Sequence, residues 1–508
     1  MFALNMALRV KIFEVSVGHP LAILNESDAR AMGILPHDRV KITHGKSDTT
    51  AFVNVSETMV QPGEIGLFED VSREIGVKEG DEVTVSILKP PRSIEAIHKK
   101  IRGETLSKEE IYAIIEDVVK HRLSDVEMAG FLLAEEFHGM TMEEIEYLTR
   151  AMAETGVMID FDRPVYDKHS IGGVPGNKVT LLIVPIVAAA GLLIPKTSSR
   201  AITSPSGTAD TMSVLAPVTF TAEELKELVE KVGGAIVWGG GTNIAPADDD
   251  LIKIEYALKI DPRSQMLASI MAKKLAVGAD CVVIDIPVGP EAKVEDMAEG
   301  RKLANQFVEL GERLGMRVQC GLTYGGQPVG HAVGPALEAK EALEALQGKG
   351  PSSLVEKSTA LAGILLEMAG LAPIGGGKDL AKSILERGKA LEKMREIIEA
   401  QGGDPNVKPE DIPLGEYRIT IEAQCDGYVT GVSNMAVNAI ARAAGAPVEK
   451  GAGVIVYWKR GAKVKKGDPL LEIFAERESK LSEAYSVATR LRPITIEGML
   501  LQRVPSFP

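Results

Sequence analysis

The stretch that decides the fold covers residues 166–210 and reads YDKHSIGGVPGNKVTLLIVPIVAAAGLLIPKTSSRAITSPSGTAD. Its middle part, residues 179–190, is almost wholly apolar and predicts a buried helix between two polar loops. Such a helix between strands is typical of an α/β protein. Free N–H groups at the start of the helix and the positive end of its dipole favour an anion. We therefore expect anion-binding loops, with phosphate as the obvious ligand.

Both loops carry side chains that suit an anion site. The first has Lys168, His169 and Ser170 ahead of the glycines Gly172 and Gly173. On its own this glycine loop is a weak signal, because its spacing matches neither a dinucleotide-binding loop nor a P-loop. The second loop is dense in hydroxyls that a packed core would not tolerate unpaired; it holds Thr197, Ser198, Ser199, Arg200, Thr203, Ser204, Ser206 and Thr208. The two loops together predict a crevice at the edge of a parallel sheet.

The composition limits the class of protein. At 508 residues the chain is too long for one core and suggests roughly three or four domains. Hydrophobic residues make up 45% and charged residues 25% of the chain, which is ordinary for a globular protein. The net charge of −14 argues against a general binder of nucleic acid or membrane surfaces, because both need clustered positive charge. Any phosphate site must therefore rest on a few positive groups gathered at one place, and not on the overall charge of the chain.

The cysteines and apolar runs bear on location. The three cysteines, Cys281, Cys320 and Cys425, are too few and too dispersed for a disulfide framework or a thiolate zinc site, so we expect a cytoplasmic protein. The longest apolar run, residues 179–194, is short for a membrane span and contains Pro185. We therefore expect no transmembrane segment.

The first part of the chain predicts a β-rich domain followed by a helical one. Residues 1–88 alternate short strands and turns, and residues 24–42 within them resemble half of a double-psi β-barrel. Residues 94–161 are helical, with capping boxes that begin at Ser107, Ser124 and Thr141. The chain is therefore an α/β multidomain protein with an N-terminal double-psi-like β-barrel.

The rest of the chain predicts two further domains. Residues 164–405 alternate apolar strands and helices, which indicates a central, mostly parallel α/β domain that binds phosphate. Part of residues 240–275 is assigned to the helical domain instead. Residues 413–508 return to strands and turns and predict a C-terminal α+β domain.

A helical stretch at residues 248–274 adds further candidates. Asp261 begins a break in its pattern, where a solvated N-cap is the simpler interpretation. Ser269 and Lys273 lie four residues apart on the following helix and can face one ligand. Lys293 follows a strand, where catalytic groups collect in open α/β sheets, although alone it would be an ordinary surface lysine.

Taken in order, these motifs resemble the thymidine/pyrimidine-nucleoside phosphorylase family. The resemblance covers roughly residues 94–500 and rests on K-H-S-x-G-G-V, S-x-R-A-I, G-T-x-D, YAL with a downstream S-x-x-x-K, and QPVGHAVGPALE at residues 327–338. It implies a helical domain and an α/β domain with a phosphate-lined active-site cleft between them, dimerisation through the helical part, and phosphorolysis of a glycosidic bond. Family phosphate contacts fall on Lys168, Ser170, Ser198 and Thr208, and base contacts on Ser269 and Lys273.

Departures from the family pattern point to one branch of it. Lys259 stands where pyrimidine-specific relatives have arginine, and residues 175–178 add one residue and a positive charge to the first loop. Extra hydroxyls and an extra lysine suggest room for a second phosphate. The chain thus resembles the archaeal branch that acts on AMP. That resemblance implies Asp261 as a proton donor, which we expect to be partly desolvated so that it keeps its proton. It places ligand contacts at Gly173, Ser199, Arg200, Ala201, Ile202, Thr203, Ser204, Thr208, Ser269 and Lys293.

The resemblance implies AMP and inorganic phosphate as substrates, a homodimer or larger homo-oligomer, and no metal or organic cofactor. One alternative is a pyrimidine or thymidine nucleoside phosphorylase that needs no 5′-phosphate. Another is a phosphoribosyltransferase, for which Asp248 to Asp250 is the only acidic cluster that could bind magnesium near pyrophosphate. A third is an oligomeric nucleotide-binding or assembly protein without catalysis.

Overall fold

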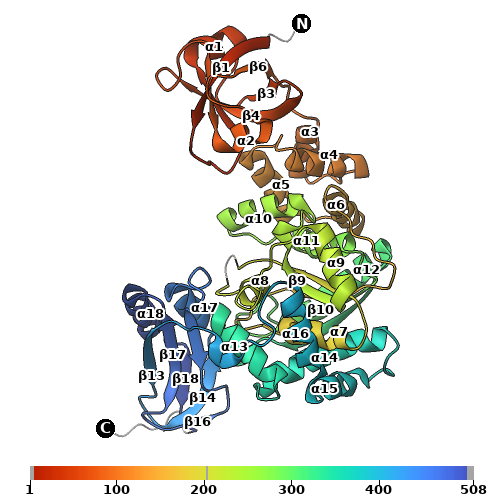
Figure 1. Ribbon diagram of the computed structural model, residues 1–508, viewed down its shortest axis with the longest axis vertical. Coiled ribbons are helices and arrows are strands. Elements are labelled where there is room, and N and C mark those ends of the chain that lie inside the picture. Colours follow the sequence, from red (N-terminus) through yellow and green to blue (C-terminus); the bar gives the residue numbers. More distant parts are fainter. Residues whose placement is uncertain (1–4, 202–203, 500–508) are drawn as a thin grey trace. The chain divides into compact units, whose positions relative to one another are not determined.

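The computed structural model describes residues 5–201 and 204–499 of the chain (Figure 1). The chain divides into two compact units. The first contains Met1–Thr155 and Ala245–Ser269, and the second contains Gly156–Ile244 and Ile270–Pro508.

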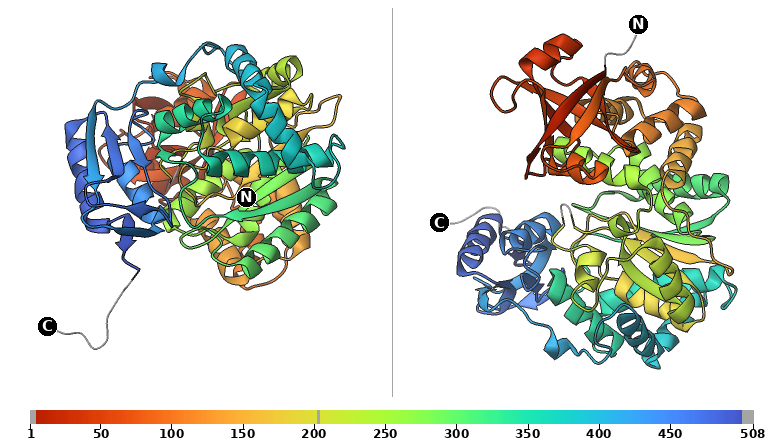
Figure 2. Two further views of the ribbon diagram at one scale, coloured as in Figure 1. Left: turned by 90° about the horizontal axis from the view of Figure 1, so that it is seen from below. Right: turned by 45° about the horizontal axis from the view of Figure 1, so that its top comes forward.

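The first unit begins with a closed six-stranded barrel, which confirms the predicted β-barrel (Figure 2). The strand order is β1-β5-β2-β4-β3-β6, and the pairs β1–β5 and β2–β4 are parallel. Buried aliphatic side chains such as Leu8, Val40 and Ile65 fill its core. The elements are β1 (Asn5–Phe13), β2 (Leu21–Asn25), α1 (Glu26–Met32), β3 (Arg39–His44), β4 (Ser47–Ser56), β5 (Glu64–Phe68), α2 (Glu69–Ile75) and β6 (Glu82–Ile87).

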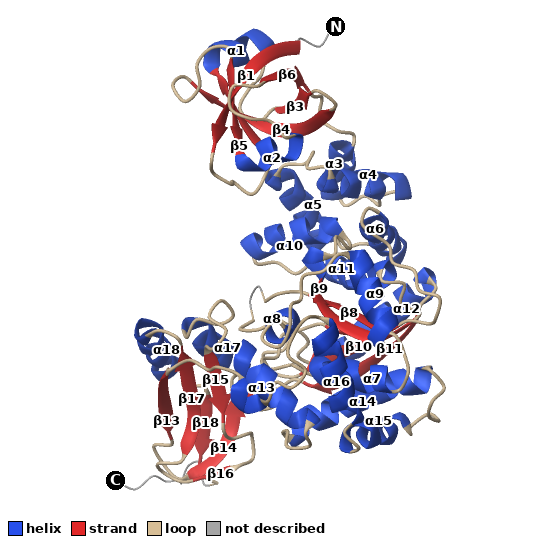
Figure 3. Cartoon of the chain, in the orientation of Figure 1, coloured by secondary structure: helices blue, strands red, loops and turns tan. Residues whose placement is uncertain are grey.

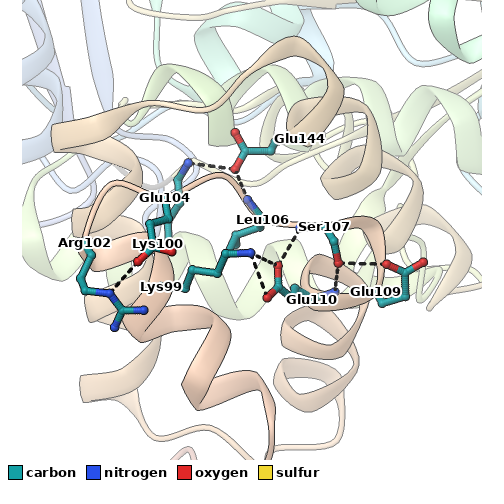
Figure 4. Close-up of polar contacts among 9 residues, drawn as sticks. All are labelled: Lys99, Lys100, Arg102, Glu104, Leu106, Ser107, Glu109, Glu110 and Glu144. Atoms are coloured by element: carbon teal, nitrogen blue, oxygen red, sulfur yellow. Dashed lines mark hydrogen bonds and ion pairs between the residues drawn. The ribbon is translucent and has the colours of Figure 1, made fainter.

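The helical part of the first unit confirms the three predicted capping boxes. In each, the side chain of Ser107, Ser124 or Thr141 accepts a hydrogen bond from the backbone N–H three residues later. A buried ion pair of 2.9 Å joins Lys100 to Glu144 and so links α3 to α6 (Figure 4). The helices are α3 (Ser93–Ile101), α4 (Lys108–Val119), α5 (Asp125–His138), α6 (Met142–Glu154), α10 (Pro246–Leu258) and the first part of α11 (Arg263–Ala276).

The second unit contains the predicted parallel α/β part (Figure 3). One sheet has the order β11-β10-β7, and the pair β8-β9 adjoins it through a parallel bridge between Val165 and Leu193. The predicted apolar helix is α7, whose side chains are nearly all buried and pack against β8 and β9. The elements are β7 (Tyr166–Ser170), α7 (Thr180–Ala189), β8 (Ile194–Ser198), α8 (Thr208–Met212), α9 (Ala222–Val232), β9 (Gly234–Trp238), β10 (Cys281–Val288), α12 (Met297–Leu314) and β11 (Arg317–Tyr324).

Helices and then antiparallel strands complete the second unit. The helices α13 (Pro335–Leu346), α14 (Ser352–Met368), α15 (Gly377–Glu386) and α16 (Lys389–Ala400) come first. The sheets β12-β15-β17-β13 and β16-β14-β18 then form the predicted C-terminal α+β part. Its elements are β12 (Ala332–Val333), β13 (Tyr417–Glu422), β14 (Gly427–Val432), α17 (Asn434–Ala443), β15 (Gly453–Val456), β16 (Lys463–Val464), β17 (Pro469–Ala475), α18 (Glu478–Leu491) and β18 (Ile494–Glu497). In the described ranges, no helix has the length and apolar character that crossing a membrane requires.

Candidate active site

Asp285 lies on β10, beside Ser170 at the carboxyl end of β7, and is fully buried. Its carboxylate accepts hydrogen bonds from Ser170 Oγ at 2.8 Å and Thr323 Oγ1 at 2.6 Å, and it pairs with Lys357 Nζ at 2.9 Å. Burial opposes ionisation, but Lys357 and then Lys168 keep the pKa of Asp285 below its usual value. Asn177 Nδ2 also donates to Ser170 Oγ, at 2.9 Å. The hydroxyl of Ser170 is therefore held in place from two sides.

Lys168, on the neighbouring strand β7, is buried without an ion pair. Its Nζ donates to Thr180 Oγ1 at 3.3 Å, and in the described part of the chain no carboxylate lies within ion-pair distance of it. Burial lowers the pKa of Lys168 to about 8, although the nearby Asp285 opposes the shift. Thr180 is the first residue of α7, so this lysine lies at the positive end of a buried helix. The arrangement suits an anion. Thr180 was not predicted from the sequence as a site residue, although its position at the start of the predicted helix was the available signal.

The structure brings Gly173 and Lys293 together. Gly173 has φ +88°, and a Cβ there would lie 2.9 Å from the backbone N of Lys293, so the loops after β7 and β10 pack directly on each other. β7 leads to β8 on one side, whereas β10 leads to β11 on the other. The two loops therefore meet at the topological switch point, where open α/β sheets bind ligands.

The hydroxyl-rich loop after β8 is folded against the start of α8. Asp210 Oδ2 accepts hydrogen bonds from the backbone N–H groups of Ala201 at 2.6 Å and Gly207 at 2.9 Å. Arg200 Nη1 lies 3.6 Å from Asp210, and its guanidinium lies 5.0 Å from the ring centre of Trp238. A Cβ on Gly207 would lie 2.7 Å from the carbonyl O of Ser199. The residues 199–201 are thus brought beside α8.

The remaining residues of this loop are placed in part. Thr208 begins α8, directly after Gly207. Ser204 Oγ donates to the carbonyl O of Ser206 at 3.2 Å, and the carbonyl O of Ser204 accepts from Arg442 Nη1 at 3.2 Å. Ile202 and Thr203 lie outside the described residues.

The expected extra positive charge of the first loop is not available to a ligand. Lys178 is 1% exposed, forms an ion pair with Glu341, and donates to the carbonyl O of Ala332 at 2.7 Å. This lysine is a neutralised part of the core. The interpretation of residues 175–178 as an added phosphate site is therefore wrong, because Glu341 on α13 already supplies the counter-charge.

Asp261 and Ser269 belong to the first unit. Asp261 lies in the turn between α10 and α11, after Lys259, which caps α10 in the left-handed conformation with φ 56°. Its side chain is exposed, so the expectation of partial desolvation is wrong, because a turn between two helices leaves it on the surface. Ser269 is half-buried on α11.

A buried acid that was not predicted from the sequence fixes the start of α11. Glu135 on α5 accepts a hydrogen bond from Ser264 Oγ at 2.7 Å, in the first turn of the helix that follows Asp261. Burial raises the pKa of Glu135 to about 7. The acidic run at residues 248–250 does not form a free cluster, since Asp250 pairs with Lys253 at 2.8 Å.

Comparison with known families gives three matches along the chain. A model described as the glycosyl transferase family helical bundle domain matches residues 94–156, and the a/b domain of the same family matches residues 162–391. A model of the pyrimidine nucleoside phosphorylase C-terminal domain matches residues 428–495.

Relatives of known name match almost the full chain. An AMP phosphorylase of Thermococcus kodakarensis is 56% identical and covers 98% of this chain and 99% of its own. An AMP phosphorylase of Thermococcus sibiricus is 55% identical with the same coverage, and AMP phosphorylase 1 of Archaeoglobus fulgidus is 56% identical over 96% of both chains. Among solved structures, an anthranilate phosphoribosyltransferase from Thermus thermophilus matches with a TM-score of 0.52, 23% identity, and coverage of 60% of this chain and 99% of its own. That likeness concerns the fold alone.

Proposed function

The chain belongs to the AMP phosphorylases of the glycosyl transferase family, and from that premise we propose that it splits AMP with inorganic phosphate into adenine and α-D-ribose 1,5-bisphosphate. A phosphate oxygen attacks C1′ of the ribose while the bond from C1′ to the base breaks. The departing adenine takes the bonding electrons and a proton. The enzyme is thus a pentosyltransferase.

The observation that carries this proposal is the buried Lys168 without a counter-charge, between Thr180 at the start of α7 and the oriented hydroxyl of Ser170. A buried ammonium group is costly unless an anion pairs with it. We assign the attacking phosphate to this group of residues, with contributions from Ser198 and Thr208. Fixed charges in a buried site also stabilise the charge that develops in the transition state.

We propose that the 5′-phosphate and ribose of AMP contact the loop at residues 199–204 together with Gly173 and Lys293. Asp210 holds the backbone N–H of Ala201, and Gly173 packs on the backbone of Lys293, so these parts of the two loops are preorganised. Ser269 is assigned to the base.

We assign the proton donor to Asp261, whose carboxyl must gain its proton in the complex with AMP, because its side chain is exposed in the free chain. An adenine anion is a poor leaving group, and protonation by a positioned acid contributes roughly 10²- to 10⁴-fold in rate. Replacing Asp261 with asparagine should therefore lower kcat by about that factor while AMP still binds. An Asp261→Asn enzyme with the kcat of the wild type would remove Asp261 from the mechanism.

Base release from AMP and from adenosine, each with inorganic phosphate, tests the reaction as a whole. We expect AMP to be strongly preferred, because adenosine lacks the group that the loop at residues 199–204 is proposed to bind. Preference for adenosine or for uridine would favour a nucleoside phosphorylase. A requirement for magnesium and pyrophosphate would favour a phosphoribosyltransferase.

We further propose a homodimer or larger homo-oligomer that works in the cytoplasm, where AMP and phosphate are available. The three cysteines are free thiols, which suits a reducing compartment. Sedimentation analysis of the full-length protein tests the oligomeric state, and a monomer would contradict the proposal.

A further inference from the structure

A second lysine without a counter-charge lies on the strand next to Lys168. Lys196 is on β8, which adjoins β7 through the parallel bridge of Val165 with Leu193, so the carboxyl ends of both strands lie at the same edge. Lys196 is 4% exposed and precedes Ser198 by two residues. Its Nζ donates to the carbonyl O of Thr197, and among the described residues it has no ion pair.

The surroundings of Lys196 are short of negative charge. Lys274 on α11 is the ion-pair partner of Asp167 on β7, so that carboxylate is already neutralised. Asp285, the carboxylate that acts most strongly on Lys168, pairs with Lys357. The charges of Asp167 and Lys168 on β7 and of Lys274 on α11 shift the pKa of Lys196. The charge of Lys196 in turn lowers the pKa of His169. Four buried lysines, 168, 196, 274 and 357, therefore share two buried aspartates, 167 and 285.

The positive charge of Lys274 also acts on Lys196. Lys274 has the carboxylate of Asp167, whereas Lys196 has only the carbonyl O of Thr197 as a described partner. Burial, followed by the charge of Lys274, lowers the pKa of Lys196 well below its usual value.

We propose that Lys196 is a phosphate-binding residue that takes up a proton when a phosphate dianion enters the site. This inference rests on the proposed function. The dianion supplies the negative charge that the cluster lacks, so Lys196 becomes protonated and donates to a phosphate oxygen in addition to Lys168. The proton comes from solvent, and no covalent bond changes. Such charge-assisted bonds are stronger than neutral ones.

Two phosphate groups are candidates for this contact, namely inorganic phosphate and the 5′-phosphate of AMP. The test uses full-length Lys196→Met, which keeps the length of the side chain and removes the amine. We expect one Michaelis constant to rise about 10- to 100-fold, as for a lost hydrogen bond to a charged group. A rise in KM for phosphate assigns Lys196 to the attacking phosphate, and a rise in KM for AMP assigns it to the 5′-phosphate.

Lys459→Met is the matched control. Lys459 is also a largely buried lysine that donates to a backbone carbonyl, that of Pro328 at 2.9 Å, and burial lowers its pKa to about 7. It lies in the C-terminal α+β part and has no assigned role. Both Michaelis constants should stay within about twofold of the wild type in this variant.

Calorimetric titration with inorganic phosphate alone, in buffers with different ionisation enthalpies, measures how many protons the protein takes up for each phosphate bound. At mildly alkaline pH phosphate is already a dianion, so its own protonation contributes little. If Lys196 binds inorganic phosphate, the wild type should take up about one proton more per phosphate than Lys196→Met does. If instead the KM for AMP rises in Lys196→Met, the same titration with AMP should show the extra proton taken up by the wild type.

The inference is overturned if neither KM changes in Lys196→Met, or if wild type and variant take up the same number of protons. Thermal unfolding of each variant separates loss of binding from loss of the fold. Because the titrations need no turnover, phosphate binding with proton uptake but no release of adenine from AMP would refute the proposed reaction alone.

Discussion

Buried lysines are handled differently in the two units. In the first unit, Lys100 is 3% exposed and pairs with the equally buried Glu144 at 2.9 Å, so one cation meets one anion. At the strand ends of the second unit, four buried lysines share two aspartates. The first arrangement is complete within the chain, and the second needs an anion from outside. A charge imbalance in a buried cluster is therefore evidence for a ligand.

The excess of buried lysines over buried aspartates is confined to the cluster of lysines 168, 196, 274 and 357. Elsewhere in the same unit, Lys178 is buried and paired with Glu341, as Lys100 is with Glu144. The second unit is thus able to neutralise a buried lysine where no ligand is proposed. This difference can be tested by removing one lysine at a time.

The largest effect is expected from Lys100→Met. This change leaves Glu144 buried without its cation, which typically costs about 3–5 kcal/mol of folding free energy. Denaturant unfolding of the full-length protein measures that loss. The Michaelis constants of the folded variant should match the wild type, and a rise in KM for phosphate would show that the pair is not purely structural.

Lys168→Met should behave in the opposite way. Removing an unpaired buried amine should leave the unfolding free energy unchanged or raise it, whereas KM for phosphate should rise about 10- to 100-fold. Unfolding and steady-state kinetics measure the two quantities on the same protein. If Lys168→Met were as destabilising as Lys100→Met, the distinction between the two clusters would fail.

Glu135 sharpens the comparison because it lies beside the Lys100–Glu144 pair. Its pKa is about 7 in the folded protein and near 4.5 when unfolded, so the native state holds a proton that the unfolded chain releases. Folding stability from this group is present below pH 4.5 and is lost as the pH rises through about 7. Between pH 4.5 and about 7, we expect the free energy of unfolding of Glu135→Gln to fall by about 1–3 kcal/mol less than that of the wild type. Equal pH dependence of the two proteins would contradict a neutral Glu135.

The smallest effect is expected from an exposed cation. Arg442 on α17 donates to the carbonyl O of Ser204 at 3.2 Å in the loop assigned to the 5′-phosphate. Exposed contacts of this kind contribute little, so Arg442→Ala should raise KM for AMP only about two- to threefold. Lys450→Ala is the control, because Lys450 donates to the carbonyl O of Ser213, beyond α8. A larger change in the control than in Arg442→Ala would remove the assigned role.

Local signals made much of the fold predictable. The capping boxes at Ser107, Ser124 and Thr141 are complete within four residues, and the apolar run of α7 needs no distant partner to be recognised. The break at Asp261 was likewise visible as an interrupted helical pattern, and the structure has a turn there between α10 and α11.

What the sequence could not give depends on distant residues. The sequence predicted that Lys178 would be free to bind a ligand, because its partner, Glu341, is far along the chain. Lys196 was not predicted as a site residue, because a lysine in a strand is expected to be exposed and only the structure shows that it is buried. Asp261 was expected to be desolvated on chemical grounds alone, whereas exposure depends on how neighbouring helices end.

A crystal structure of the full-length protein with inorganic phosphate tests the central claim most directly. We predict phosphate oxygens at charge-assisted hydrogen-bond distance, about 2.7–2.9 Å, from the Nζ of Lys168, with Ser170 in the same site. Phosphate bound elsewhere, with Lys168 still lacking an anionic partner, would contradict the account.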